Sequence, residues 1–325
     1  MKLAAPFPYF GGKRRAAPLI WVALGDPSGY VEPFAGSAAV LLARPPHKGR
    51  RVETLNDADG WLVNMWRAIQ HSPDAVADAA YGPVTEIDYH ARLAWLQERR
   101  DADLVAWLEG DPTNHDPRAA GWWLYVMACG IGDPFGGGPW RVVDGKLADT
   151  RKLPHLGDAG RGVNRELPHL GDAGKGALWV YMRALAERLK RTRITCGPWQ
   201  RCVKPSVTRA GAGGDGSRAV LLDPPYSTSG DLYAASANDS GEISAEVRQW
   251  CIAGTTGLRV VLCGFEDEHD ELLSHGWVKV AGKSGGGGGY NNTIVGAGRR
   301  ERLWLSPACL GVHQQGELLD ALALT

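Results

Sequence analysis

Short apolar runs and longer amphipathic segments alternate near the start of the chain. One strand is predicted to end near Val31, where a turn containing Gly36 leads into a helix beginning around Ser37. A second strand, residues 52–55, ends in Asn56-Asp57, and a helix follows it. That helix is predicted because its apolar residues recur at helical spacing: Leu62, Met65, Trp66 and Ile69.

The alternation returns after residue 178. "LWVYMRALAERLKRTR" and "EVRQWCIAG" predict helices, while "ITCGPW", "AVLLDPPY", "LRVVLCGF" and "RRERLWLSP" predict strands. Continuous apolar runs of this kind are typical of parallel strands buried on both faces. Repeated strand–turn–helix units predict a doubly wound α/β sheet, in which ligands bind at the carboxyl ends of the strands. We therefore expect one α/β domain built from residues 1–70 and 179–325.

The middle of the chain, residues 71–178, has a different character. "DYHARLAWLQERRDADLVAWLEG" and "PRAAGWWLYVMACGIG" predict helices, and "DPFGGGPW" then interrupts all periodicity. Two similar segments follow, "RKLPHLGDAGRGVN" and "RELPHLGDAGKGAL", and they are too short to form a solenoid. The sequence thus predicts an inserted, mostly helical and loop-rich domain, with Trp122 and Trp123 packed in its core.

Composition narrows the class of protein. Hydrophobic residues make up 44% and charged residues 22%, as in ordinary globular proteins, and no run approaches the length of a membrane span. The formal net charge is zero, so only a local basic face could attract a polyanion. The six cysteines form no CxxC pair and the N-terminus does not read as a signal peptide, which together predict a reducing cytoplasm and no structural zinc.

The most unusual local feature is the strand exit Asp223-Pro224-Pro225-Tyr226. Prolines have no N–H and a restricted φ, so this segment is rigid and its carbonyl groups are not used by a strand ladder. The Asp223 carboxylate and the Pro224 carbonyl would offer two acceptors to an amino group, and the Tyr226 ring could stack on a planar base. The alternative is a cis-proline turn beside a core tyrosine.

Two further turns favour a nucleoside-bearing cofactor. Gly36 in "EPFAGS" allows close approach of the backbone to a ligand, and the amides of the following helix can act as donors. Asp57 ends the second strand, where a carboxylate commonly binds ribose hydroxyls. Either turn alone is more often an ordinary surface turn with an acidic cap.

Taken together, the motifs resemble those of the adenine-specific DNA methyltransferases of the bacterial DNA adenine methylase type, particularly phage-borne relatives. Four stretches carry the resemblance in the family's order: "PYFGGKRRAAPLI", "YVEPFAGSAAVLL", "LNDADGWLVNMWRAIQ" and "LLDPPY". The tail "RRERLWLSP" is also similar to phage relatives. The resemblance implies a Rossmann-like fold that uses S-adenosylmethionine (SAM), with the insert as its target-recognition domain.

The resemblance also implies roles for individual residues. Asp57 would bind the ribose hydroxyls of SAM, and Asp223, Pro224, Pro225 and Tyr226 would receive a flipped adenine and direct its N6 nitrogen to the methyl group. Asp223 would also border the cofactor. The remaining residues implied to hold or enclose SAM are Tyr9, Gly12, Lys13, Glu32, Pro33, Phe34, Ala35 and Gly36.

The chain departs from the family pattern at two places. Pro198 in "ITCGPW" stands where relatives often carry an acidic residue that contacts the adenine ring of the cofactor, so Trp199 or the backbone would have to substitute. The turn "GSAA" lacks a second glycine that many relatives have.

Within the insert, each repeated loop presents a basic residue among glycines. Contacts to double-stranded DNA are predicted for His155, Arg161, His169 and Lys175, the alternative being plain turns capped by aspartates. A zinc site at the two histidines is the less favoured interpretation. The protein is expected to be a monomer or a weak dimer.

Two other functions remain open at this point. One is methylation of cytosine N4 or of RNA, which uses a similar acceptor turn; Asp-Pro-Pro-Tyr favours adenine and the Gly-Gly-Lys opening favours DNA. The other is a catalytically silent DNA-binding protein with the same fold. The presence of Lys13, Asp57 and Asp223 argues against the silent protein.

Overall fold

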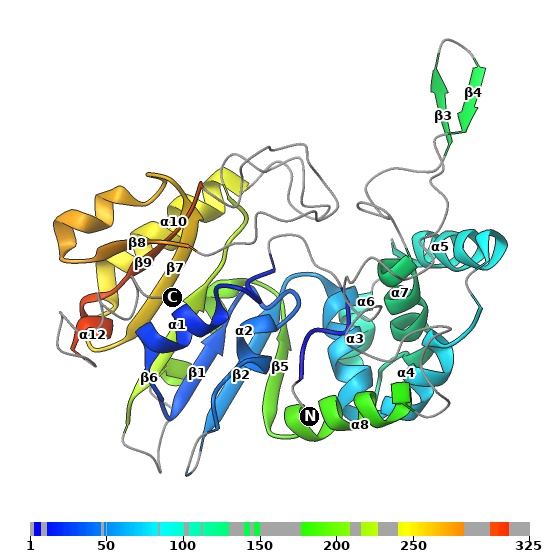
Figure 1. Ribbon diagram of the computed structural model, residues 1–325, viewed down its shortest axis with the longest axis horizontal. Helices are drawn as coiled ribbons and strands as arrows, with labels where there is room; N and C mark the ends of the chain where they lie inside the picture. Colours follow the sequence, from blue (N-terminus) through cyan, green and yellow to red (C-terminus); the bar gives the residue numbers. More distant parts are fainter. Residues whose placement is uncertain are drawn as a thin grey trace. The chain divides into compact units, whose positions relative to one another are not determined.

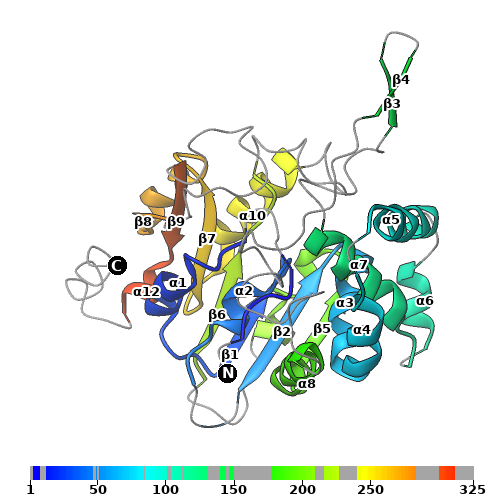
Figure 2. The same cartoon turned by 45° about the vertical axis from the view of Figure 1, so that its right-hand side comes forward.

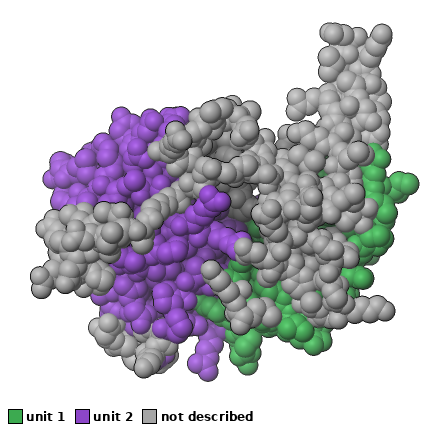
Figure 3. Space-filling model, viewed as in Figure 1, with its two compact units in different colours: residues 1–10, 60–190, 288–292 green, residues 11–59, 191–287, 293–325 purple. Residues whose placement is uncertain are grey.

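The computed structural model describes residues 3–7, 12–46, 49, 51–83, 85–100, 104–111, 113–129, 140–143, 146–149, 177–208, 216–226, 240–282 and 300–311. The chain forms two compact units, coloured separately in Figure 3. We call residues 11–59, 191–287 and 293–325 the sheet unit, and residues 1–10, 60–190 and 288–292 the helical unit.

The sheet unit is built on seven strands in the order β5-β2-β1-β6-β7-β9-β8. The first five in this order pair in parallel, whereas β9 runs antiparallel between β7 and β8 (Figures 1 and 2). This arrangement confirms the predicted Rossmann-like α/β fold. The strands are β1 (Gly29–Glu32), β2 (Val52–Asp57), β5 (Thr192–Cys196), β6 (Arg218–Leu222), β7 (Arg259–Phe265), β8 (Val278–Ala281) and β9 (Glu301–Leu305).

Alternation along the strands gives the sheet two different faces. On one face, Val220 of β6 and Val260 of β7 pack with Val247 of α10 in a continuous apolar core. On the other face, the ring of Tyr30 in β1 lies 4.7 Å from that of Trp21 in α1. The helices of this unit are α1 (Ala17–Leu24), α2 (Ala39–Leu42), η2 (Trp199–Arg201), α9 (Pro205–Thr208), α10 (Ser240–Gly254), η4 (Asp270–His275) and α12 (Pro307–Leu310).

Two local details differ from the predictions. The helix expected from Ser37 begins at Ala39, because Gly36 and Ala38 adopt left-handed φ values of 46° and 49° and form a turn first. The strand β8 was not predicted, since its short half-buried run carries little apolar signal.

The helical unit contains α3 (Gly60–His71), α4 (Pro73–Ala80), α5 (Glu86–Arg100), α6 (Leu104–Gly110), α7 (Pro117–Cys129) and α8 (Ala177–Leu189). It thus includes α3 and α8, which the sequence had placed in the α/β part. A two-stranded hairpin, β3 (Trp140–Val143) with β4 (Lys146–Asp149), was not expected in the insert. Among the described residues, no helix combines the length and apolarity needed to cross a membrane.

Aromatic packing and one glycine hold the helical unit together. The Phe7 ring lies 6.0 Å from Trp66 and 4.7 Å from Trp123, which is only 5% exposed, as predicted for its core. Trp122 is half-buried instead and packs edge-on against Trp95. A Cβ atom at Gly121 of α7 would lie 2.5 Å from the side chain of Ala79 in α4, so these two helices require glycine at their contact.

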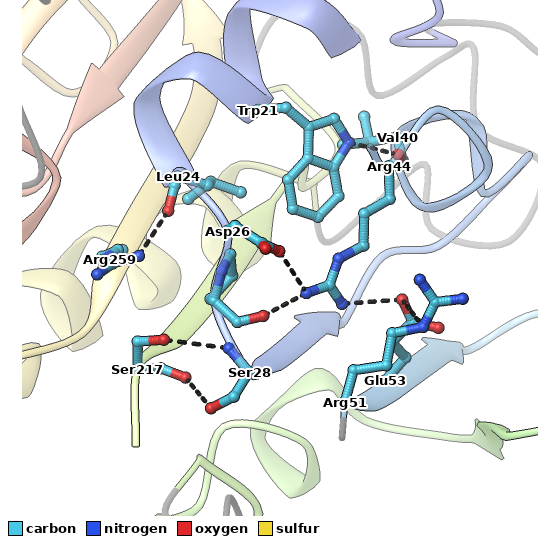
Figure 4. A network of polar contacts seen from close by, with 11 residues as sticks. Trp21, Leu24, Asp26, Ser28, Val40, Arg44, Arg51, Glu53, Ser217 and Arg259 are labelled. Carbon is cyan, nitrogen blue, oxygen red and sulfur yellow. Dashed lines mark hydrogen bonds and ion pairs between the residues drawn. The ribbon is translucent and has the colours of Figure 1, made fainter. Parts of the chain in front are cut away.

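A buried arginine organises the amino-terminal edge of the sheet (Figure 4). The Arg44 side chain is fully buried, and its Nη1 lies 2.8 Å from Oε1 of Glu53, which is 2% exposed. Its Nη2 donates to the carbonyl of Pro27 and lies 3.5 Å from Asp26. The pair therefore joins the segment before β1 to β2 at the edge opposite the strand exits.

Arg44→Met is expected to lower the free energy of unfolding by about 3–5 kcal/mol, because it leaves the Glu53 carboxylate buried without its main partner. The double variant Arg44→Met/Glu53→Leu should recover most of this loss, and denaturant unfolding followed by circular dichroism measures both. The matched control is Arg183→Met, whose partner Asp74 is 52% exposed, and it should cost less than about 1 kcal/mol. Equal losses in the two single variants would contradict this account.

Candidate active site

The polar residues singled out by the sequence lie at the carboxyl edge of the sheet. β1 ends at Glu32, β2 ends at Asp57, and Asp223 follows β6 directly. The antiparallel strand β9 begins at this same edge, because its first residue, Glu301, pairs with Phe265 at the end of β7. The edge therefore collects acidic side chains from several segments that are far apart in sequence.

One cluster of four side chains forms around the Asp-Pro-Pro-Tyr segment. The Lys13 ammonium group, 5% exposed, lies 2.8 Å from Oδ1 of Asp223 and 2.9 Å from Oε1 of Glu301. The Tyr226 hydroxyl lies 3.1 Å from the same Asp223 oxygen and 3.0 Å from the same Glu301 oxygen. The ammonium and the hydroxyl thus each bridge the two carboxylates.

The groups around Asp223 shift its pKa in opposite directions. Burial raises the pKa of the Asp223 carboxyl above its usual value, the Lys13 ammonium lowers it, and the Glu301 carboxylate raises it again. The buried Cys263 thiol of β7 also hydrogen-bonds to Asp223, and burial holds the pKa of that thiol well above the ordinary range. Asp223 is therefore a basic carboxylate with a cationic partner.

The remaining residues of the segment are held firmly. Pro224 is buried and Pro225 half-buried, and the described peptide bonds are all trans, unlike the alternative cis-proline turn. The Tyr226 ring is 4% exposed and packs edge-on against Phe265 at 4.4 Å. The acceptor role of the Pro224 carbonyl and the stacking of a base on Tyr226 stay predictions.

Glu32 lies in the interior of the same edge. It is 2% exposed, and the Tyr30 hydroxyl donates to its Oε1 across 2.5 Å. Burial is the main cause that raises the pKa of Glu32 to about 8, and the nearby Asp223 charge adds to it. Burial thus favours the neutral form of Glu32, and its predicted contact to a cofactor stays a prediction.

The loop after β1 is tied to the end of β2. The Gly36 amide donates to Oδ2 of Asp57 across 2.9 Å, and the Asp59 amide donates to Oδ1 across 3.0 Å. The half-buried Asp57 carboxyl has a pKa raised to about 6, chiefly by burial. Both oxygens keep further lone pairs, so this carboxylate can accept hydrogen bonds from a ligand.

Asn56 of β2 joins two loops at this edge. Its side-chain amide donates to the carbonyls of Pro33 and Gly197, each across 2.9 Å, and its carbonyl oxygen accepts from Thr195. It thereby aligns the turn after β1 with the turn after β5.

An aromatic pair borders this part of the edge. The Phe34 and Trp199 rings lie 6.0 Å apart and tilted by 31°, and the buried indole nitrogen of Trp199 has no hydrogen-bond partner among the described residues. Trp199 follows Pro198, whose φ of −58° opens the short helix η2. Two aromatic rings therefore lie beside Pro198, the position at which relatives often carry an acidic residue.

Some predicted site residues receive no structural account. Tyr9 and the four predicted DNA-contact residues, His155, Arg161, His169 and Lys175, lie outside the described residues. Gly12 is exposed, while Pro33, Ala35 and Gly36 are buried in the loop after β1. Within the described ranges, no group of three or more His, Cys, Asp or Glu side chains could hold a metal ion.

Sequence reasoning missed Glu301, Cys263 and Asn56. Glu301 did leave a signal, because it occupies the same phase of β9 as the buried Leu303 and Leu305 and so had to be an interior acid. Cys263 offered no comparable signal, since it reads as an ordinary strand position, and Asn56 was singled out only as the residue before Asp57.

Comparison with known proteins bears on this edge of the sheet. Residues 9–88 match the family model of the D12 class N6 adenine-specific DNA methyltransferases. The resemblance inferred from the motifs is confirmed by this match, which includes Lys13, the loop after β1 and Asp57 but stops before Asp223. No curated protein matches the chain. The D12 match supports N6-adenine DNA methyltransferase activity in general terms.

The turn before α2 yields a prediction about the D12-matched loop. Ala38 has φ 49° and ψ 28° and is fully buried, a conformation that is disfavoured for side chains with a Cβ. Ala38→Gly relieves this strain but loses a buried methyl group, so the free energy of unfolding should change by less than about 1 kcal/mol.

Ala38→Val should instead cost about 2 kcal/mol or more, because a branched side chain is poorly tolerated in a left-handed position without space. The control is Ala39→Val at the first residue of α2, expected to cost less than about 1 kcal/mol. Thermal or denaturant unfolding checks all three variants, and equal losses for the two valines would refute the strain.

Proposed function

We propose that this protein transfers a methyl group from SAM to the exocyclic N6 amino group of an adenine flipped out of a specific sequence in double-stranded DNA. The observation that carries the proposal is the Asp223 carboxylate, held at the exit of β6 by Lys13 and Tyr226. The D12 match over the cofactor side of the same edge supports it.

The residues at the edge fit the chemistry of SAM. The Asp57 carboxylate would accept hydrogen bonds from the ribose hydroxyls, while the Gly36 amide donates to its Oδ2 and holds it in place. Phe34 and Trp199 offer flat apolar surface to an adenine ring. When bound, SAM supplies an electrophilic methyl group.

Asp223 would act on the amino group of the target base. An adenine N6 donates through its two N–H bonds, and the Asp223 carboxylate with the Pro224 carbonyl would accept both, aiming the nitrogen lone pair. One N6 proton must leave once the nitrogen is methylated. A carboxylate whose pKa is raised by burial and by Glu301 is a better acceptor for that proton than an ordinary aspartate.

The helical unit is proposed as the target-recognition domain. Its residues overlap those of the insert that the resemblance implies. A target-recognition domain would hold the DNA while the target base leaves the stack, which must happen before N6 can reach Asp223. The repeated loops with His155, Arg161, His169 and Lys175 remain the predicted DNA contacts.

Asp223→Asn is expected to lower the rate of methyl transfer at least about 100-fold, because the neutral amide cannot take the N6 proton. Transfer of radiolabelled methyl groups from SAM to plasmid DNA measures the rate. The control Asp267→Asn makes the same change at an exposed position and should leave the rate unchanged.

Mass spectrometry of the digested product separates the proposed function from its alternatives. N6-methyladenine is expected. N4-methylcytosine, methylated RNA alone, or no incorporation by the wild-type protein would each overturn the proposal.

Binding of SAM should depend on pH through Asp57, whose pKa is raised to about 6. Above pH 6 the ionised Asp57 carboxylate accepts hydrogen bonds from the ribose hydroxyls, and below pH 6 the protonated carboxyl group accepts them less well. The affinity for SAM should therefore fall about tenfold between pH 7.5 and pH 5. Isothermal titration calorimetry measures the affinity. Asp57→Asn should bind about 10-fold or more weakly at pH 7.5 and lose this dependence on pH, whereas an unchanged slope in the variant would exclude Asp57 as its source.

A further inference from the structure

Glu301 connects the two side chains that flank Asp223. It is 4% exposed, and its Oε1 lies 2.9 Å from the Lys13 ammonium and 3.0 Å from the Tyr226 hydroxyl. Neither Lys13 nor Tyr226 contacts Asp223 independently of this carboxylate, because the same nitrogen and the same hydroxyl oxygen are shared between the two acids.

We propose that Glu301 is a positioning residue for methyl transfer, which holds Lys13 and Tyr226 so that Asp223 meets the substrate amino group as a free, ionised acceptor. The inference rests on the proposed function and extends it to the first residue of β9, in the tail "RRERLWLSP" and outside the four stretches that carry the resemblance.

The hydroxyl of Tyr226 shows how Glu301 would act. A phenol has one proton to donate, and Glu301 competes with Asp223 for it at nearly equal distances, 3.0 Å and 3.1 Å. Whenever the hydroxyl donates to Glu301, a lone pair of Asp223 is released for the N–H of a substrate. Without Glu301, both Lys13 and Tyr226 would have Asp223 as their acceptor in this cluster.

The charges of the cluster lead to the same conclusion. Asp223 is faced by Lys13, by Glu301 of β9, by the Tyr226 hydroxyl, by the Cys263 thiol of β7 and by Glu32 of β1. The ammonium keeps Asp223 ionised, while the second carboxylate partly cancels the ammonium and so preserves the proton affinity of Asp223. An acceptor for the N6 proton needs both properties.

The backbone around Glu301 is suited to a positioning role. Its pairing with Phe265 places it on the sheet, and the amide of Glu266 donates to the carbonyl of Arg300 across 2.7 Å. The guanidinium of Arg300 also binds both carboxylate oxygens of Glu266, at 2.9 Å and 3.2 Å. The start of β9 is thus clamped on the end of β7, independently of the four clustered side chains.

Glu301→Gln tests the inference, since it keeps the size of the side chain and removes its charge. The kcat for methyl transfer to DNA should fall about 10- to 100-fold with the KM for SAM changed less than about threefold. Loss of the Glu301 charge lowers the pKa of Asp223, so the acid limb of the kcat profile should move to lower pH. Glu271→Gln, an exposed carboxylate paired with Arg248, is the matched control and should keep the wild-type kcat and profile.

A readout without substrate separates positioning from a general structural defect. ¹³C NMR of aspartate carboxyl groups in the free protein reports the titration of Asp223, assigned by the signal lost in Asp223→Asn. The midpoint should move to lower pH in Glu301→Gln. It should move to higher pH in Tyr226→Phe, because that change removes a donor to the Asp223 carboxylate.

If Glu301→Gln does not fold, Glu301→Asp carries the test, because it keeps the charge but shortens the side chain away from Lys13 and Tyr226, so kcat should fall at least about 10-fold with the KM for SAM changed less than about threefold. A wild-type kcat and unshifted midpoint in Glu301→Gln, or a wild-type kcat in Glu301→Asp, would overturn it. An inactive wild-type protein would instead remove the proposed function, whereas an active one with an unaffected Glu301→Gln variant would remove only the role of Glu301.

Discussion

The buried Lys13 ammonium group allows two acidic side chains to lie together at the carboxyl edge of the sheet. Asp223 and Glu301 are carboxylates close enough to share the same partners, and two such charges in the interior would repel each other and lose their hydration. Lys13 lies within 2.9 Å of both and offsets much of that cost. Because the three residues come from the segment before α1, the exit of β6 and the start of β9, the ion cluster also determines where these segments meet.

The two edges of the sheet have different roles: the amino-terminal edge stabilises the fold, and the carboxyl edge carries the candidate site. At the amino-terminal edge, both terminal nitrogens of Arg44 have partners within the protein, Nη1 in Glu53 and Nη2 in the Pro27 carbonyl and Asp26 (Figure 4). At the carboxyl edge, the Asp57 and Asp223 carboxylates can still accept hydrogen bonds from a ligand. This division is expected for open α/β sheets, whose ligands bind beyond the carboxyl ends of the strands.

The apolar runs predicted most of the sheet, and the turns after β1, β2 and β6 predicted Asp57 and Asp223, because these signals are local. Glu301 could not be paired with Asp223 in advance, since their contact depends on β9 inserting antiparallel beside β7. The late start of α2 could not be predicted either, because it results from a left-handed backbone conformation at Ala38 and alanine does not favour that conformation. Long-range register and backbone strain are what sequence patterns leave out.

The acids at the carboxyl edge differ in the partners that oppose the effect of burial on their pKa values. Burial raises the pKa of Glu32 to about 8 and so favours its neutral form, although the Tyr30 hydroxyl and a backbone amide oppose that rise. Asp57, with a pKa of about 6, is ionised but lies against the amides of the loop after β1. Asp223 shares the Lys13 ammonium with Glu301. The strand exit with two prolines is therefore the position at which a buried carboxylate can stay charged and still accept a proton.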